Sequence, residues 1–153
     1  MRNYRFGNTS RVNISTVCPD LQNICHGAIR IANRRKLHCP DFGISRGLTT
    51  AEAQFELFKK GRTYIPQTAV WSTIDKTKVV TNCDGFEIES PHQSANAVDF
   101  FAIESGRANY GAGNLALVAT CFYEAAIDQG LEIEWGGNYR SFSDAPHIEL
   151  IKK

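Results

Sequence analysis

Residues 97–102 read AVDFFA, a compact apolar run that is interrupted by one acid. Six residues are too few for a helix of ordinary length, so the run predicts a strand. The acid, Asp99, stands between Val98 and Phe100, and an ionised carboxylate that is buried without a partner is costly. We therefore expect Asp99 to bind a metal ion, to pair with an arginine or to face solvent.

The rest of the chain alternates between helical and strand patterns. Residues 131–135 and 147–151 alternate apolar and polar side chains, which is typical of half-buried strands, and residues 42–45 predict a shorter strand. Helical spacing predicts helices over residues 16–35, 51–60 and 114–129. The segment 62–89 is expected to be a long loop that carries short strands or a hairpin.

Several residues mark the expected helix ends. Pro19 suits the first turn of the first helix, and Thr49 with Glu52 has the spacing of a capping box for the second. Gly61 and Gly130 suit the positions that follow a helix C-terminus. These elements predict an α+β fold, in which two or three helices pack on a small antiparallel sheet. At 153 residues and 17.0 kDa, we expect one domain over residues 1–153 and no separate binding domain.

Composition excludes several classes of partner. Seventeen Lys and Arg against sixteen Asp and Glu leave a formal charge of +1, so we expect no binding to nucleic acid. No segment reaches the length of an apolar membrane span, so we expect no stable membrane insertion. Five cysteines without regular spacing favour a reducing compartment, and hence synthesis in a cytosol.

Two of the four histidines lie in polar, turn-like surroundings with acids at short spacings. His92 precedes Asp99 by seven residues, and His147 follows Asp144 by three. Two imidazoles and one carboxylate can hold Zn²⁺ at three tetrahedral corners and leave the fourth for water, at the rim of the sheet. Asp144 is close enough in sequence to reach that water, and Glu149 shares the strand face of His147.

Other interpretations of these residues remain open. A lone histidine at a strand end is more often structural than a metal ligand. Cys25-His26 and His38-Cys39, with Cys18, offer a competing metal site, but adjacent pairs do not match the spacing of common structural zinc sites. A nucleophilic Cys83 is conceivable, although nothing in the sequence visibly activates its thiol.

The combination of motifs is more specific than its parts. Ser90-x-His92, Asp99, Trp135-Gly136-Gly137 and the run from Asp144 to Leu150, DAPHIEL, together resemble the M15 peptidases. The resemblance is notably to phage L-alanyl-D-glutamate endopeptidases, which are related to D-Ala-D-Ala carboxypeptidases. Residues 61–63 and 81–85 also resemble such endolysins, so the likeness covers roughly residues 17 to 151.

The resemblance implies a zinc-dependent hydrolase of an amide bond, L-Ala-D-Glu, in peptidoglycan stem peptides. It implies His92, Asp99 and His147 as zinc ligands and Asp144 as the general base. Ser90 and Glu149 are candidates for orienting these ligands. Residues that bind the substrate are left unknown.

Two departures from the family pattern bear on activity. Where the family commonly has Gly-x-Arg-Thr, this chain has Thr49 in place of the arginine that polarises the scissile carbonyl. Arg46, three positions earlier, is our candidate to replace it. The stretch 94–96, Ser-Ala-Asn, stands where a glycine-containing stretch is more usual.

An endolysin implies a bacteriophage protein with antimicrobial activity in host cell lysis. We expect a monomer that is made in the cytoplasm of the bacterial host and acts in the periplasm, on the cell wall, once a pore-forming partner releases it. The alternatives are a D-Ala-D-Ala carboxypeptidase or dipeptidase and, because the arginine is missing, a catalytically silent wall-binding module.

Overall fold

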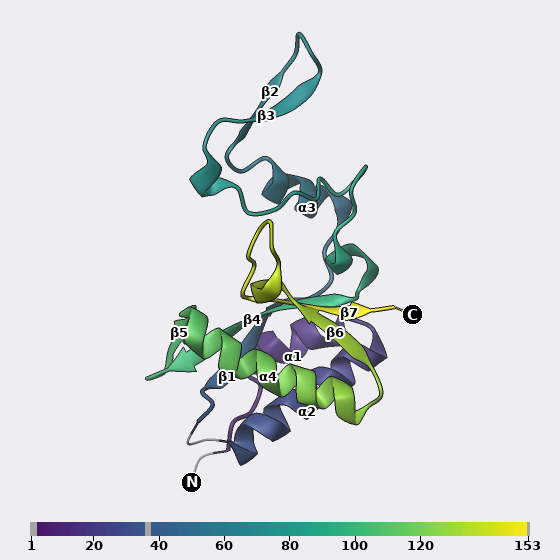
Figure 1. Ribbon diagram of the computed structural model, residues 1–153. Coiled ribbons are helices and arrows are strands. Elements are labelled where there is room, and N and C mark those ends of the chain that lie inside the picture. Colours follow the sequence, from purple (N-terminus) through teal and green to yellow (C-terminus); the bar gives the residue numbers. More distant parts are fainter. Residues whose placement is uncertain (1–2, 36–37, 153) are drawn as a thin grey trace. The chain divides into compact units, whose positions relative to one another are not determined.

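The computed structural model describes residues 3–35 and 38–152, and these divide into two compact units (Figure 1). One unit contains the described residues up to Leu48 and those from Ala95 onward, and the other contains Thr49–Ser94. Within the described residues, no helix is both long and apolar enough to cross a membrane. That the whole chain is one catalytic domain stays a prediction.

The larger unit is built on an antiparallel sheet. Its strands lie in the order β1 (Asp41–Arg46), β4 (Ala97–Glu104), β7 (His147–Ile151) and β6 (Glu132–Trp135), and β5 (Arg107–Asn109) pairs with β4. The strands predicted around residues 42–45, 97–102, 131–135 and 147–151 are therefore confirmed. β4 runs two residues further than expected because Ile103 and Glu104 continue its pairing with β1 and β5.

The α-helices of this unit lie on one face of the sheet: α1 (Asn8–Ser15), α2 (Pro19–Arg34) and α4 (Ala112–Asp128) (Figure 1). Pro19 occupies the first turn of α2, and Gly130 follows α4 with a φ of 67°, as the sequence predicts. The α+β prediction is confirmed. α1 was not predicted, because polar side chains hold it: Ser10 Oγ accepts a hydrogen bond from the backbone N of Ile44, and Asn13 donates to the Ile44 carbonyl.

Strand alternation separates a core face from an opposite face. Val98, Phe100 and Ala102 of β4 are fully buried, whereas Asp99 and Phe101 between them are only half-buried. In β7, Ile148 and Leu150 are buried in the same core. Since successive side chains of a strand point to opposite faces, Asp99, His147 and Glu149 lie on the face that the core does not cover.

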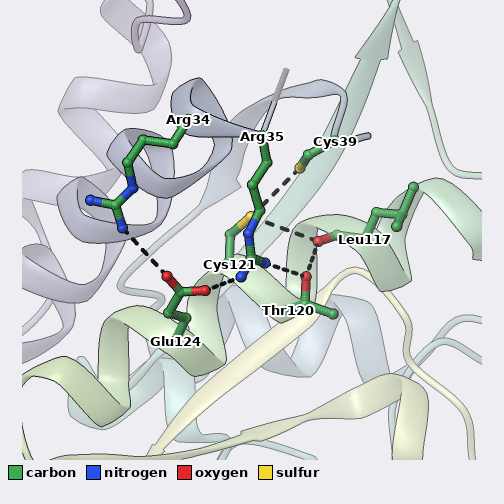
Figure 2. A network of polar contacts seen from close by, with 7 residues as sticks. All are labelled: Arg34, Arg35, Cys39, Leu117, Thr120, Cys121 and Glu124. Carbon is green, nitrogen blue, oxygen red and sulfur yellow. Dashed lines mark hydrogen bonds and ion pairs between the residues drawn. The ribbon is translucent and has the colours of Figure 1, made fainter. Parts of the chain in front are cut away.

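α2 and α4 pack closely through small side chains. A Cβ atom added to Gly27 would lie 2.9 Å from the Cβ of Ala125. At the C-terminal end of α2, Arg34 and Arg35 pair with Glu124 of α4 (Figure 2). These ion pairs are exposed to solvent and contribute at most about 1 kcal/mol each, so the apolar contact dominates.

The smaller unit holds the second predicted helix and the predicted hairpin. It contains α3 (Ala51–Phe58), β2 (Arg62–Ile65) paired with β3 (Val70–Thr73), and the short 3₁₀ turns η1 (Lys76–Lys78) and η2 (Pro91–Ser94). The capping-box prediction is wrong by one residue, because Thr50 is the N-cap of α3 and its hydroxyl accepts from the backbone N of Ala53. The backbone N of Thr49 instead donates to the His92 carbonyl.

The α2–α4 contact yields a stability prediction. Gly27→Ala gains about 1 kcal/mol of helix propensity, but the overpacking against Ala125 costs about 1–3 kcal/mol, so we expect a net loss of about 1 kcal/mol. Gly113→Ala in α4 is the matched control, because its added Cβ meets no atom within 4 Å. This control should be neutral or stabilising. Urea unfolding measures both, and equal effects of the two variants would contradict close packing at Gly27.

Candidate metal centre

The pairing of β4 with β7 brings together two predicted ligands that lie 48 residues apart. Asp99 and His147 are direct partners in the antiparallel register. The Nδ1 atom of His147 lies 3.2 Å from Oδ1 of Asp99. The side chain of His147 is nearly buried, at 7% exposed, and that of Asp99 is 20% exposed. The acid that interrupts the apolar run is therefore largely shielded from solvent, and it has an imidazole as a partner.

A β-bulge in β1 places Arg46 on the other side of Asp99. The register pairs Ile44 with Phe100, and then skips one residue so that Arg46 pairs with Asp99. Without the extra residue, Ser45, Arg46 would fall one position further and point into the core. As built, an Nη1 atom of Arg46 lies 3.6 Å from Oδ2 of Asp99. Asp99 thus stands between an imidazole and a guanidinium.

His92 lies in the 3₁₀ turn η2 and is buried, with 2% of its surface exposed. Its backbone N contacts the hydroxyl of Ser90 at 3.3 Å, and the backbone N of Ser90 donates to the side chain of Gln93. Ser90 therefore fixes the backbone of the turn that carries the histidine. That it orients a metal ligand stays a prediction.

Ligand atoms of His92, Asp99 and His147 all lie within 4.8 Å of one another. Two imidazoles and one carboxylate are a donor set suited to divalent transition metals such as zinc. In the part of the chain that the structure describes, no second group of three potential metal ligands is found. The competing site around Cys25 and His38 is therefore not formed.

The charges around His147 favour a cation. Burial by itself lowers the pKa of His147, but the hydrogen bond to Asp99 and the negative charges of Asp99, Asp144 and Glu149 outweigh it and raise the pKa above the ordinary 6.5. The same negative field that holds a proton on the imidazole would attract a metal ion. The residues present therefore fit a bound cation, and that cation would replace the proton.

The loop after β6 holds Asp144 near this cluster. The carbonyl of Gly136 accepts hydrogen bonds from the backbone N atoms of Tyr139 and Asp144, at 3.2 and 2.9 Å. Trp135 closes the loop by donating from its ring Nε1 to the Ala145 carbonyl at 2.7 Å. A Cβ on Gly136 would lie 2.2 Å from the Asp144 carbonyl oxygen, so only glycine fits. The Trp-Gly-Gly motif is thus a device that positions Asp144.

Glu149 has a partner that sequence reasoning missed. The hydroxyl of Tyr139 donates to Oε1 of Glu149 at 2.5 Å, and the Tyr139 ring lies 6.1 Å from the His147 ring between centroids. The one signal in the sequence is an aromatic residue soon after Gly136-Gly137. Its importance emerges only when the loop is folded over β7.

The backbone between His92 and Asp99 shows why the family usually has a glycine in this stretch. Ala95 has a φ of 61°, in the left-handed region that a residue with a Cβ adopts only at a cost. A glycine would adopt it without strain. The usual glycine-containing stretch is thus suited to this backbone, and the present chain keeps the conformation with alanine.

Comparison with known proteins identifies the family of this chain. The profile of a family described as phage L-alanyl-D-glutamate peptidase matches residues 2–151. The chain belongs to this family. A relative of this chain is the peptidoglycan L-alanyl-D-glutamate endopeptidase CwlK of Bacillus subtilis (strain 168), which is 30% identical to it over 116 residues. That match covers 72% of this chain but only 61% of CwlK.

A solved structure supports the fold. The crystal structure of the L-Ala D-Glu endopeptidase ChiX of Serratia marcescens matches with a TM-score of 0.72 and covers 98% of this chain and 92% of ChiX. At 24% sequence identity, this likeness concerns the fold alone. The predicted family is confirmed, and the individual roles of the site residues stay predictions.

The raised pKa of His147 gives opposite pH dependences with and without metal. In metal-free protein, the protonated His147 contributes stability that is present below the unfolded pKa of about 6.5 and is lost as the pH rises through the folded pKa. A bound divalent cation needs the neutral imidazole, so its stabilising effect grows over the same rise in pH.

Thermal unfolding between about pH 5 and pH 9, with chelator or with Zn²⁺, measures both trends. The difference in Tm between the two conditions should increase with pH. Asp99→Asn removes the main group that raises the pKa of His147, so it should flatten the trend in chelator. A Tm difference that shrinks as pH rises would contradict metal binding by His147.

Proposed function

We propose that this protein is a zinc-dependent endopeptidase that hydrolyses the L-Ala-D-Glu amide bond of peptidoglycan stem peptides. The observation that carries the proposal is the convergence of His92, Asp99 and His147, with ligand atoms within 4.8 Å of one another. Membership of a family described as phage L-alanyl-D-glutamate peptidase supports the substrate. The names of CwlK and ChiX describe the same activity for those two proteins.

Zinc is the metal that we propose for this donor set. Nitrogen and carboxylate ligands suit it, and three protein ligands are the usual number in a catalytic zinc site, where one position stays open. Zinc in this position would acidify a water molecule and polarise the carbonyl of the scissile amide. Residues of the chain would perform the proton transfers and help to stabilise the negative oxygen that develops.

Asp144 is the proposed general base. Two observations support this role: its negative charge contributes to raising the pKa of His147, and a hydrogen bond to the Gly136 carbonyl fixes the loop that carries it. In the proposed reaction, Asp144 accepts the proton of the attacking water and then gives it to the nitrogen of the departing D-Glu. A carboxylate is suited to both transfers.

Arg46 is the proposed replacement for the arginine that Thr49 displaces. The β-bulge turns its guanidinium toward the site, 3.6 Å from Asp99. From there its charge would stabilise the negative oxygen that develops as water attacks the amide carbonyl. The pairing with Asp99 also keeps the side chain oriented in the absence of substrate.

The family description also supports a phage endolysin. In this proposal the protein is made in the cytoplasm of the bacterial host as a monomer and reaches the wall through a pore-forming partner. Its action there would lyse the host and would be antimicrobial when the protein is added from outside.

The test is digestion of purified cell walls. We expect release of new amino termini, no new reducing-sugar ends, loss of activity in chelator and recovery with Zn²⁺. His92→Ala should lose both zinc and activity, because it removes one ligand of the group. Asp144→Asn should keep its zinc and lose about 10²–10⁴-fold in rate, because general base catalysis contributes about that much.

Mass spectrometry of the digested muropeptides identifies the bond that is cut. Release of terminal D-Ala would instead mean a D,D-carboxypeptidase. Binding to walls without any cleavage at saturating zinc would mean a silent wall-binding module. Either result would overturn the proposed function.

The role of Arg46 has its own test. Arg46→Ala should lower the rate of wall cleavage by about 10²–10³-fold, the usual effect of removing one group that stabilises an oxyanion. Zinc content should stay near one ion per chain. Arg107→Ala, an exposed arginine on β5 of the same sheet, is the matched control and should cleave at the wild-type rate. An undiminished rate in Arg46→Ala would remove Arg46 from the mechanism.

A further inference from the structure

Glu149 is a fourth potential metal ligand beside the cluster. It lies two residues after His147 on the same face of β7, so their Cα atoms are about 6.6 Å apart, a gap that a glutamate side chain can span. A glutamate carboxylate is also a common zinc ligand.

A fourth protein ligand would change the character of the site. Zinc with four protein ligands is typical of structural sites, whereas a catalytic site has three and leaves one position for water or substrate. Glu134 of β6 is the cross-strand partner of Glu149 and is exposed. Like charges directly opposite each other repel, so Glu134 favours movement of the Glu149 carboxylate toward a cation.

Tyr139 holds Glu149 in place. Its hydroxyl donates to Oε1 of Glu149 at 2.5 Å, and its ring lies against that of His147. Its backbone N donates to the Gly136 carbonyl, the same oxygen that anchors Asp144. A tyrosine hydroxyl carries its proton at neutral pH, so it can serve as the donor in this hydrogen bond to Glu149.

We propose that Tyr139 is a positioning residue whose hydroxyl keeps the Glu149 carboxylate off the metal, and so reserves one coordination position for substrate. This inference rests on the proposed zinc site. In this inference Glu149 does not orient a metal ligand. Its carboxylate instead has to be held away from the metal. The restraint comes from a neutral donor, which adds no charge to the site.

Tyr139→Phe tests the inference, because it removes the hydroxyl and keeps the ring. We expect the variant to bind Zn²⁺ about tenfold or more tightly, in line with the 10–100-fold effects of groups around metal ligands. The visible absorption spectrum of the Co²⁺-substituted protein should change, because the set of ligands changes. Wall cleavage should fall through kcat rather than KM. Adding Glu149→Gln to this variant should reverse the gain in zinc affinity and restore the wild-type Co²⁺ spectrum.

The sign of the affinity change separates this role from structural damage. A loop that is merely loosened would bind zinc more weakly, so weaker or unchanged binding by Tyr139→Phe with a wild-type Co²⁺ spectrum overturns the inference. If Tyr139→Phe does not fold, Glu149→Gln alone decides: wild-type zinc affinity supports the inference, and a tenfold loss overturns it by showing that Glu149 already supports the metal. Failure of the wild-type protein to bind zinc would instead overturn the proposed function.

Discussion

A half-buried carboxylate on an inner strand is the constraint around which this site is organised. Asp99 interrupts the core-forming pattern of β4, and a negative charge in that position needs compensation. Strand alternation turns it away from Phe100 and the core, and the neighbouring strands supply His147 on one side and Arg46 on the other. The bulge in β1 brings Arg46 beside this charge, and the position of β7 next to β4 brings His147 beside it.

A pair of cationic partners alone would make Asp99 an ordinary ion pair. What distinguishes the site is the excess of acids around His147, where Asp144 and Glu149 act together with Asp99. His92 then adds a second imidazole within reach of the same point. This excess of negative charge favours a cation, which supports the proposed metal centre.

The amino-acid pattern predicts the elements of the sheet and the long helices well, because these depend on local periodicity. It does not predict α1, whose attachment to β1 depends on hydrogen bonds between Ile44 and the side chains of Ser10 and Asn13 rather than on an apolar stripe. The cap at Thr50 differs from the expected one because two neighbouring threonines offer the same chemistry, and only the backbone conformation separates them.

The site was predictable as a set of residue types and a resemblance, but not as a geometry. Nothing local in the sequence fixes the register that pairs Asp99 with His147, since the partners come from strands that meet only in the folded sheet. The face on which Arg46 lies depends on a single extra residue in β1. The contacts of Tyr139 with Glu149 and His147 depend on the conformation of the loop that carries it. The Trp-Gly-Gly motif indicates that conformation only in outline.

The inner place of β7 has a consequence for the newly made protein. β7 follows every other described element in the chain, yet it lies between β4 and β6 in the sheet. His147 is therefore synthesised after the other described elements of the sheet. Asp99 cannot pair with it until β7 has been translated. Contacts between such distant segments also form slowly. A partly synthesised chain that still lacks β7 consequently has no complete cluster.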